Sequence, residues 1–362
     1  MRKTQGLMTR PCTCTLLSFP MAATACSSPS ITTTRVSELR WDSVHGEWVV
    51  IAPARQERTY HPPAGYCPLC PPRPGGPATE LPSAAFEVAV FENQFPSFTT
   101  EDASDDGVPT ITAPGTHPAT APAYGCCEVV VYSPEHEGSL GELSVQQIER
   151  LIRVWAHRYD ALSAIPGIRY VLIFENRGPE IGVTLTHPHG QIYGYPFVPP
   201  LAARELAVAR TYRETTGNCI HCHALSQERK AGVRVLIDDA QVLAYVPFAA
   251  RWPFEVHITT QQHCSSLLEI DGVQRQALAR ALKQVLRAYD ALFDLPMPYL
   301  LAVRQQAVAH DRREQAHLYF ELCPARRAPD KLKHRAGSET FMGVFINDVV
   351  PEAAAQRLRA LL

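Results

Sequence analysis

The sequence lacks both a marked excess of charge of one sign and any long apolar run. Its 362 residues include 34 Lys and Arg against 36 Asp and Glu, a formal net charge of −2. This balance provides no basic face for nucleic acid, so we expect no nucleic-acid partner. No apolar run reaches the roughly 18 residues of a membrane-spanning helix, so we expect no membrane partner. Apolar residues make up 46% and charged residues 19% of the chain, which is typical of a globular protein in water.

The first 36 residues also lack helical or strand periodicity and are rich in Thr, Ser, Pro and Cys. We expect a disordered N-terminal extension over residues 1–36, in which Met21 is an alternative start. The stretch from Leu16 to Cys26 resembles a secretion signal only weakly, because Ser18 and Pro20 interrupt its short apolar part.

The chain contains many cysteine and histidine residues. There are 11 cysteines, an odd number, and 14 histidines, and four of the cysteines form two Cys-x-x-Cys pairs. This pattern favours metal ligation in a reducing compartment over a disulfide framework, and we expect a cytoplasmic protein.

An internal repeat organises the chain from residue 37 onward. Each half contains a Cys-x-x-Cys pair, a histidine, the tetrapeptide Tyr-Asp-Ala-Leu and a last histidine. The tyrosine and the last histidine are 28 residues apart in both halves, at 159 and 187 and at 289 and 317. Agreement along the whole series indicates a duplicated unit. We predict an N-terminal half over residues 37–199 and a C-terminal half over residues 200–362.

Each half also has the same predicted secondary structure. Ser144 and Gln147 form a capping box at the start of one long amphipathic helix, and Asp271 begins another that runs to about Leu292. We expect strands over residues 128–132, 170–174, 254–259 and 299–303, a linker over about 199–218, and surface loops over 71–77 and 103–123. Strands interleaved with a long helix, twice over, indicate an α+β fold with a mostly antiparallel sheet in each half.

The Cys and His residues of each half have the spacing of a zinc site. Zinc prefers four N or S ligands in a tetrahedron, and a Cys-x-x-Cys turn supplies two of them. We predict two structural Zn²⁺ sites per chain, because four protein ligands leave no open position. The predicted ligands are Cys67, Cys70, His136 and His187 in the first half, and Cys219, Cys222, His263 and His317 in the second. The alternative ligands in the second half are His221 and His223, which flank Cys222.

The segment from 187 to 192 (His-Pro-His-Gly-Gln-Ile) has the pattern of a reactive strand. Pro188 favours an extended backbone before it, and alternate residues of a strand project to one face. We therefore expect His187, His189 and Gln191 on one face. A neutral imidazole attacks phosphorus and also leaves it readily, so we predict that His189 is a nucleophile, held by a hydrogen bond from its other ring nitrogen to a carbonyl. The alternative is that His189 is a further metal ligand or a buried structural histidine.

This segment resembles the signature of the galactose-1-phosphate uridylyltransferases, a branch of the histidine triad superfamily. The resemblance extends over about residues 37–362 and includes further motifs that are specific only in combination. These are Arg40-Trp-Asp, Gly46-Glu-Trp-Val49, Arg55-Gln-Glu-Arg58, Phe91-Glu-Asn-Gln-Phe-Pro96, Ser133-Pro-Glu-His136, Phe174-Glu-Asn-Arg-Gly178 and Trp252-Pro-Phe-Glu255. The resemblance implies two histidine-triad-like halves.

The resemblance also implies a role for each matching residue. His189 would carry the uridylyl group, and Gln191 would stabilise that intermediate. The binding residues would be Asn176, Gly182 and Thr184 around the phosphates, Asn93 and Phe95 at the uridine, Arg55 and Arg58 reaching the nucleotide from a partner subunit, and Lys333 and Glu339 at the sugar.

The second half departs from the family pattern. Tyr319 occupies the position equivalent to His189, so only the first half is expected to be catalytic. Some members bind iron in this half through one Glu and three His. Glu205 and His317 persist here, but Tyr319 and Ala302 fall where other ligands would be, so we expect no such iron site.

The implied activity is transfer of UMP from UDP-glucose to galactose-1-phosphate through a uridylyl-histidine, in a homodimer whose active sites are shared between subunits. The alternatives are a nucleoside-diphosphate-sugar phosphorylase of the ADP-glucose type and a zinc-stabilised nucleotide-binding protein without turnover. A glutamine that some members direct at galactose has no match near Phe345 and Ile346, which leaves the acceptor sugar open.

Overall fold

The computed structural model describes residues 36–57, 62–81, 83–100, 111–308 and 316–362. The expected disordered extension lies almost wholly outside these ranges, and so do Arg58 and residues 103–110 of an expected loop. The described chain from residue 36 onward belongs to one compact unit. No helix within the described ranges is both long enough and apolar enough to cross a bilayer.

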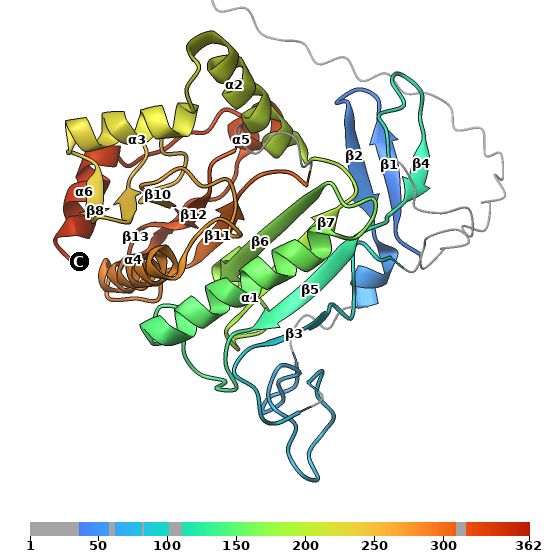
Figure 1. The fold of residues 1–362 in the computed structure, drawn as a ribbon. Coiled ribbons are helices and arrows are strands. Elements are labelled where there is room, and N and C mark those ends of the chain that lie inside the picture. The colour runs from blue at the N-terminus through green and yellow to red at the C-terminus, as the bar shows by residue number, and fades with distance from the viewer. Residues whose placement is uncertain (1–35, 58–61, 82, 101–110, 309–315) are drawn as a thin grey trace, which may run out of the picture. The chain divides into compact units, whose positions relative to one another are not determined.

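Among the described residues, nine strands form one antiparallel sheet that runs through both halves of the chain (Figure 1). In spatial order its strands are β3 (Ala89–Glu92), β5 (Cys126–Val131), β7 (His189–Tyr195), β6 (Tyr170–Arg177), β11 (Tyr299–Arg304), β12 (Tyr319–Pro324), β10 (Val256–Thr260), β9 (Val242–Tyr245) and β8 (Val235–Asp238). A smaller sheet has the order β2 (Glu47–Ile51), β1 (Glu38–Asp42) and β4 (Thr120–Pro122), and β13 (Arg326–Ala328) pairs with β14 (Lys331–Leu332).

The helices are α1 (Val145–Ser163), α2 (Pro200–Thr216), α3 (Ile220–Ala231), α4 (Gly272–Ala291), α5 (Gly337–Met342) and α6 (Pro351–Arg359), with 3-10 helices η1 (Pro53–Glu57) and η2 (Pro179–Ile181). The two predicted long helices are α1 and α4. Ser144 and Asp271 cap them, and each accepts a hydrogen bond from the backbone of a glutamine three residues later. The apolar side of each helix is buried against the sheet, and the two helices pack against each other.

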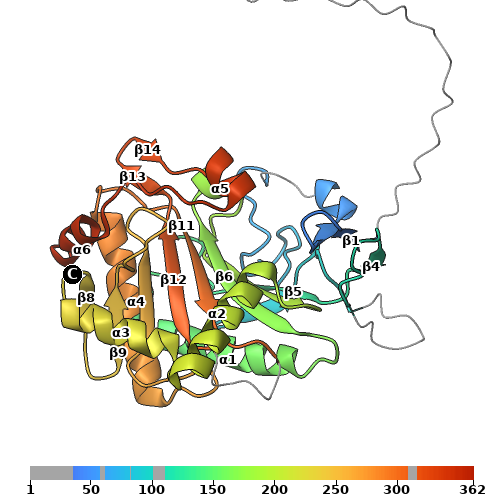
Figure 2. The ribbon, with the colours of Figure 1, turned by 90° about the horizontal axis from the view of Figure 1, so that it is seen from above.

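The antiparallel α+β fold and its duplication are confirmed, and the two halves meet within the sheet. Strands β5, β6 and β7 surround α1 in sequence as β10, β11 and β12 surround α4. The halves join where β6 pairs with β11, from Tyr299 opposite Arg177 to Val303 opposite Ile173. Figure 2 shows β12, β11 and β6 following one another across this junction. Sequence patterns predicted a sheet in each half but not this continuity.

The linker predicted over residues 199–218 is wrong, because residues 200–216 form α2. Pro200 occupies the first helical position, where its missing N–H costs no hydrogen bond, and Gly217 ends the helix in a left-handed conformation with φ 74°. Only Ala202 and Ala209 are buried, so no apolar periodicity marks the helix. The predicted loop over 103–123 is also partly wrong, since its end forms β4.

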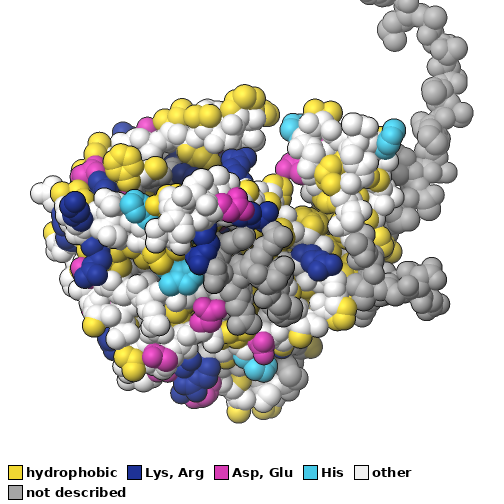
Figure 3. Space-filling view, turned by 45° about the horizontal axis from the view of Figure 1, so that its top comes forward, with side chains coloured by type: hydrophobic (Ala, Val, Ile, Leu, Met, Phe, Trp, Pro, Cys, Tyr) yellow, Lys and Arg dark blue, Asp and Glu magenta, His cyan; other side chains and the backbone are white. Residues whose placement is uncertain are grey.

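The face shown in Figure 3 carries basic and acidic side chains in a mixed arrangement. Among the described residues, several charged side chains are paired, including Arg229 with Asp238 and Arg153 with Glu149. Exposed pairs of this kind contribute little to stability. The mixed arrangement on this face agrees with the formal net charge of −2.

Candidate active site and metal clusters

The first predicted cluster forms as expected. Cys67, Cys70, His136 and His187 each place one ligand atom within 4.8 Å of the others. The Cys70 thiol lies 3.3 Å from His136 Nδ1 and 3.7 Å from His187 Nδ1. Zinc bonds of about 2.1 and 2.3 Å set N and S ligands about 3.6 Å apart in a tetrahedron. His187 is buried and its Nε2 donates to the Ser133 carbonyl at 2.9 Å, so Nδ1 is the nitrogen left to bind a metal. Donor set and tautomer therefore fit zinc.

The second predicted cluster has the same form, with ligand atoms again within 4.8 Å of one another. Its members are Cys219, Cys222, His263 and His317. Two of its thiol–imidazole separations are 3.4 and 3.6 Å, which also suits a tetrahedral metal ion. Among the described residues, the alternative ligands His221 and His223 do not belong to this cluster. His221 Nε2 instead faces the Glu205 carboxylate at 3.7 Å.

His189 is the first residue of β7 and lines a cavity of about 300 Å³. Its Nδ1 lies 2.7 Å from the His187 carbonyl oxygen. Because a carbonyl only accepts, Nδ1 carries a proton, and in the neutral form of the ring the lone pair is on Nε2. The predicted hydrogen bond to a carbonyl is thus confirmed, and it links His189 to the backbone of His187, a member of the first Cys2His2 cluster.

Gly190 points to the opposite face of β7, where space is limited. A Cβ there would lie 2.2 Å from Tyr132 Oη and 3.0 Å from the Phe174 carbonyl oxygen. Tyr132 Oη donates to Glu175 Oε2 at 3.1 Å, and Tyr299 Oη donates to Glu175 Oε1 at 3.0 Å. Burial raises the pKa of Glu175 to about 7, although the two tyrosine hydrogen bonds act in the other direction.

The cavity beside His189 brings several predicted site residues together. From the predicted set it is lined by His189, Gln191, Asn93, Phe95 and Thr184. Sequence reasoning missed Tyr66 and Leu69, which form another part of its wall. Both lie in or next to the first Cys-x-x-Cys turn. The spacing that predicted this turn near His187 was therefore also a signal that its neighbours face the same space.

A second cavity, of about 270 Å³, is lined by His189, Asn176 and Thr184 among other residues. Gly182 follows η2 in a left-handed conformation with φ 86°. Among the described residues that line these two cavities, Gly182 is not present. Of the three residues predicted around the phosphates, Asn176 and Thr184 therefore line one cavity and Gly182 does not.

Arg55 lies in η1 and contacts the segment that carries two of the predicted uridine residues. Its Nη1 donates to the Phe95 carbonyl at 3.1 Å and lies 3.3 Å from Ser97 Oγ. Within its own chain, Arg55 thus holds the segment after Asn93 in place. Its predicted companion Arg58 lies outside the described residues.

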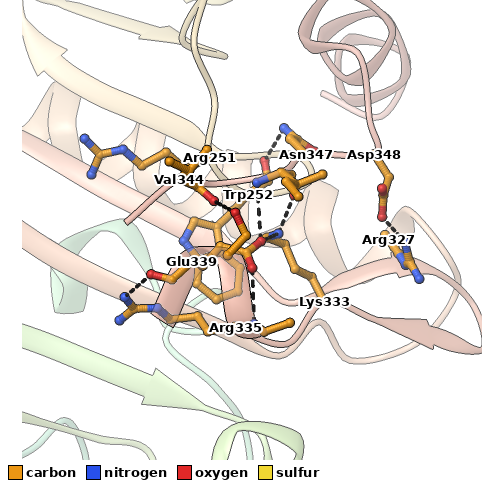
Figure 4. A network of polar contacts seen from close by, with 12 residues as sticks. Arg251, Trp252, Arg327, Lys333, Arg335, Glu339, Val344, Asn347 and Asp348 are labelled. Atoms are coloured by element: carbon orange, nitrogen blue, oxygen red, sulfur yellow. Dashed lines mark hydrogen bonds and ion pairs between the residues drawn. The ribbon is translucent and has the colours of Figure 1, made fainter. Parts of the chain in front are cut away.

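Lys333 and Glu339 form the centre of a polar network around α5 (Figure 4). Lys333 Nζ donates to Glu339 Oε1 at 2.8 Å and to the Ile346 carbonyl at 2.5 Å, while the Ala336 amide donates to Glu339 Oε2 at 3.2 Å. The lysine holds the pKa of Glu339 well below its ordinary value. Among the described residues that line the His189 cavity, neither of the two is present. Their contact with a sugar stays a prediction.

The second half places a phenol where the first half has its imidazole. Tyr319 begins β12 opposite Thr259, as His189 begins β7 opposite Val131. Tyr319 Oη donates to Glu205 at 2.8 Å. Burial and this carboxylate raise the pKa of Tyr319 well above its ordinary value, so the phenol stays protonated and is a poor nucleophile.

The fold and these sites define a class of duplicated α+β proteins. Each half contains one Cys2His2 cluster, and one half alone has a histidine at the start of the strand that follows its last cluster histidine. The particular family is given by sequence comparison. The chain belongs to the galactose-1-phosphate uridyl transferase family, whose N-terminal domain matches residues 29–199 and whose C-terminal domain matches residues 205–362. The resemblance noted in the sequence is confirmed, and with it membership of a family of transferases.

Known proteins of this kind match over nearly their whole length. The galactose-1-phosphate uridylyltransferase of Thermotoga maritima is 37% identical over 324 residues, which is 89% of this chain and 98% of that protein. A solved uridylyltransferase structure is 34% identical with a TM-score of 0.77, over 90% of this chain and 98% of that one. An ADP-glucose phosphorylase of Arabidopsis thaliana, solved with bound ADP-glucose, is 27% identical with a TM-score of 0.68, over 90% and 99% of the two chains.

Proposed function

We propose that this chain transfers UMP from UDP-glucose to galactose-1-phosphate through a uridylyl group carried on His189. The observation that carries the proposal is the 2.7 Å hydrogen bond from His189 Nδ1 to the His187 carbonyl. It holds the ring beside a cavity with the proton on Nδ1, so that in the neutral imidazole the lone pair is on Nε2. Family membership and the named relatives support the uridylyl donor and the galactose acceptor.

The reaction then consists of two displacements at one phosphorus atom. Nε2 of His189 attacks the α-phosphorus of UDP-glucose, an N–P bond forms, and the P–O bond to glucose-1-phosphate breaks. Galactose-1-phosphate next attacks the same phosphorus, breaks the N–P bond and restores the neutral ring. The ring is positively charged in between, and the His187 carbonyl stabilises that charge through Nδ1–H.

Polar groups around the cavity would stabilise the phosphoryl oxygens. Gln191 lies two residues after His189 on the same face of β7, so its amide reaches the same side of the phosphate. Asn176 and Thr184 line the adjoining cavity and would donate further hydrogen bonds there.

We further propose one zinc ion in each Cys2His2 cluster, two per chain. With four protein ligands, bound Zn²⁺ supplies a structural cross-link and no open position for substrate. In the first half the ligands hold His187, whose carbonyl in turn orients His189. Because the ligand thiols must stay reduced to bind metal, we also propose a cytoplasmic location.

We propose a homodimer with shared active sites, in which Arg55, Arg58, Lys333 and Glu339 serve the partner's cavity. Support comes from Arg55, Lys333 and Glu339, which are not among the described residues that line the His189 cavity of their own chain. Light scattering would measure the mass in solution. Chains with His189→Ala and chains with Arg55→Ala should each be nearly inactive, yet recover activity when mixed, since one composite site is then intact. No recovery in mixed dimers would contradict site sharing.

An isotope-exchange assay tests the core of the proposal. Labelled glucose-1-phosphate should exchange into UDP-glucose with no second sugar present, because the uridylyl-enzyme forms reversibly. His189→Ala should abolish the exchange and keep the fold and the metal content. A wild-type protein that binds UDP-glucose without exchange would instead be the nucleotide-binding protein without turnover.

The ADP-glucose phosphorylase relative favours a second candidate function, phosphorolysis of ADP-glucose on the same fold. Initial rates with UDP-glucose or ADP-glucose as donor and galactose-1-phosphate or inorganic phosphate as acceptor separate the two. We expect UDP-glucose with galactose-1-phosphate to be fastest. If ADP-glucose with phosphate is fastest, the phosphorylase function replaces ours and His189 keeps its role.

A further inference from the structure

We propose that the buried carboxyl of Glu175, together with the hydroxyls of Tyr132 and Tyr299, positions the reactive strand from behind and is required for the rate of transfer. The proposal rests on the function proposed above for His189. It assigns Glu175 as a positioning residue that acts through Tyr132.

The contact that transmits this effect is between Tyr132 and Gly190. Gly190 separates His189 from Gln191, and both of these side chains lie on the opposite face of β7. Tyr132 Oη lies 2.2 Å from the position that a Cβ at Gly190 would occupy, so it lies directly beside the Gly190 backbone. A shift of this hydroxyl therefore moves the backbone between the nucleophile and its neighbouring amide. Misplacement of reacting groups by about 1 Å can cost about 100-fold in rate.

The polar nature of this group is not explained by stability. Glu175 is 4% exposed, Tyr132 2% and Tyr299 0%. Burying a carboxyl is costly, and apolar side chains of similar volume would fill the same space at lower cost. The hydrogen bonds at 3.1 and 3.0 Å are directional, and they fix the positions of both phenol groups relative to one carboxyl. The group is thus better suited to fixing a position than to adding stability.

The group of Glu175, Tyr132 and Tyr299 also spans the junction between the two halves. Glu175 lies on β6 opposite Leu301 of β11, and Tyr299 comes from β11 itself. Arg177, two residues after Glu175, lies 5.7 Å from the Tyr299 ring and pairs with Asp290 at 2.6 Å. The non-catalytic half therefore holds one arm of the group that positions His189.

Steady-state kinetics of folded variants test the proposal. Tyr132→Phe and Glu175→Leu should lower kcat by about 10- to 100-fold, with KM for UDP-glucose within about twofold, because only the reacting geometry changes. Glu175→Gln keeps an oxygen acceptor and should recover most of kcat. The matched control is Tyr159→Phe, a buried tyrosine bonded to the Gln306 carbonyl, which should keep wild-type kcat.

A second pair of variants tests the contact itself. Gly190→Ala should be nearly inactive, and adding Tyr132→Phe should partly restore it by removing the atom that meets the new Cβ. Wild-type kcat in folded Tyr132→Phe and Glu175→Leu, or no gain in the double variant, would overturn the positioning role. If His189→Ala keeps exchanging label, the proposed function fails instead, so the two failures are distinguishable.

Discussion

Two residues at equivalent places in the sheet, His189 and Tyr319, are suited to opposite chemistry. The first is an imidazole held by a backbone carbonyl, and the second is a protonated phenol held by Glu205. The register of β7 and β12 is the same at these positions. The two halves therefore place different side chains at the same position of equivalent strands.

This difference predicts that Tyr319→Phe leaves transfer almost unchanged. The variant loses one buried hydrogen bond, which should cost about 1 kcal/mol of unfolding free energy. Glu205 keeps its ion pair with Arg304. Thermal unfolding and kcat of the purified variant are the measurements. A loss of activity as deep as that of His189→Ala would show that the second half takes part in the chemistry.

Glu175 predicts a pH dependence of stability. Its pKa is raised from 4.5 to about 7 in the folded protein. Between pH 4.5 and about 7 the folded chain binds a proton at Glu175 that the unfolded chain has lost. The contribution of Glu175 to the free energy of unfolding therefore falls as pH rises through this range. The difference in unfolding free energy between wild type and Glu175→Gln should therefore shift against wild type by up to about 3 kcal/mol.

Urea unfolding of both proteins at pH 5 and pH 7.5 measures this shift. Because the glutamine variant cannot titrate at this position, it subtracts the contribution of the other ionisable groups. An equal difference at the two pH values would mean that Glu175 keeps an ordinary pKa. A shift in favour of wild type would reverse the sign that burial predicts.

At the scale of elements, the two Cys2His2 clusters differ in the elements that their residues connect. The first includes His187, which precedes β7 and orients His189, whereas the second includes Cys222 in the first turn of α3. A metal ion in the first cluster would thus support the reactive strand. One in the second would tie α3 to the segment before β12.

We predict about two zinc ions per chain in protein purified without chelators. Cys219→Ser should lower zinc to about one per chain and reduce the melting temperature, with kcat retained. His187→Ala should lower both zinc and kcat. Metal analysis and kinetics on the same samples measure this. A wild-type protein without zinc would remove the basis for both sites.

Elements were predictable where local chemistry and burial agree. The capping boxes at Ser144 and Asp271, each followed by an apolar stripe, located α1 and α4 closely. The helix α2 was missed because it exposes most of its surface. Strand β4 was missed because its three residues pair with β1 far away in sequence.

At the scale of the whole molecule, the sequence predicted both clusters and the hydrogen bond of His189, since spacing and one short motif encode them. The group of Glu175, Tyr132 and Tyr299 was beyond it. Glu175 and Tyr299 come from β6 and β11 and Tyr132 directly follows β5, so only the tertiary register brings them together. The pairing of β6 with β11 was not predictable for the same reason, because no local sequence pattern indicates it.

That pairing has a consequence for the chain as a folding unit. Cut between residues 198 and 199, each fragment would expose β6 or β11 as a long, unpaired apolar edge, the kind of edge that templates aggregation. We predict that fragments 1–198 and 199–362 are each insoluble when expressed alone and form a soluble, active pair when expressed together. Co-purification through a tag on one fragment measures this. Two fragments that are soluble and monomeric by themselves would show that the duplication left two self-sufficient modules, rather than two pieces that complete each other's sheet.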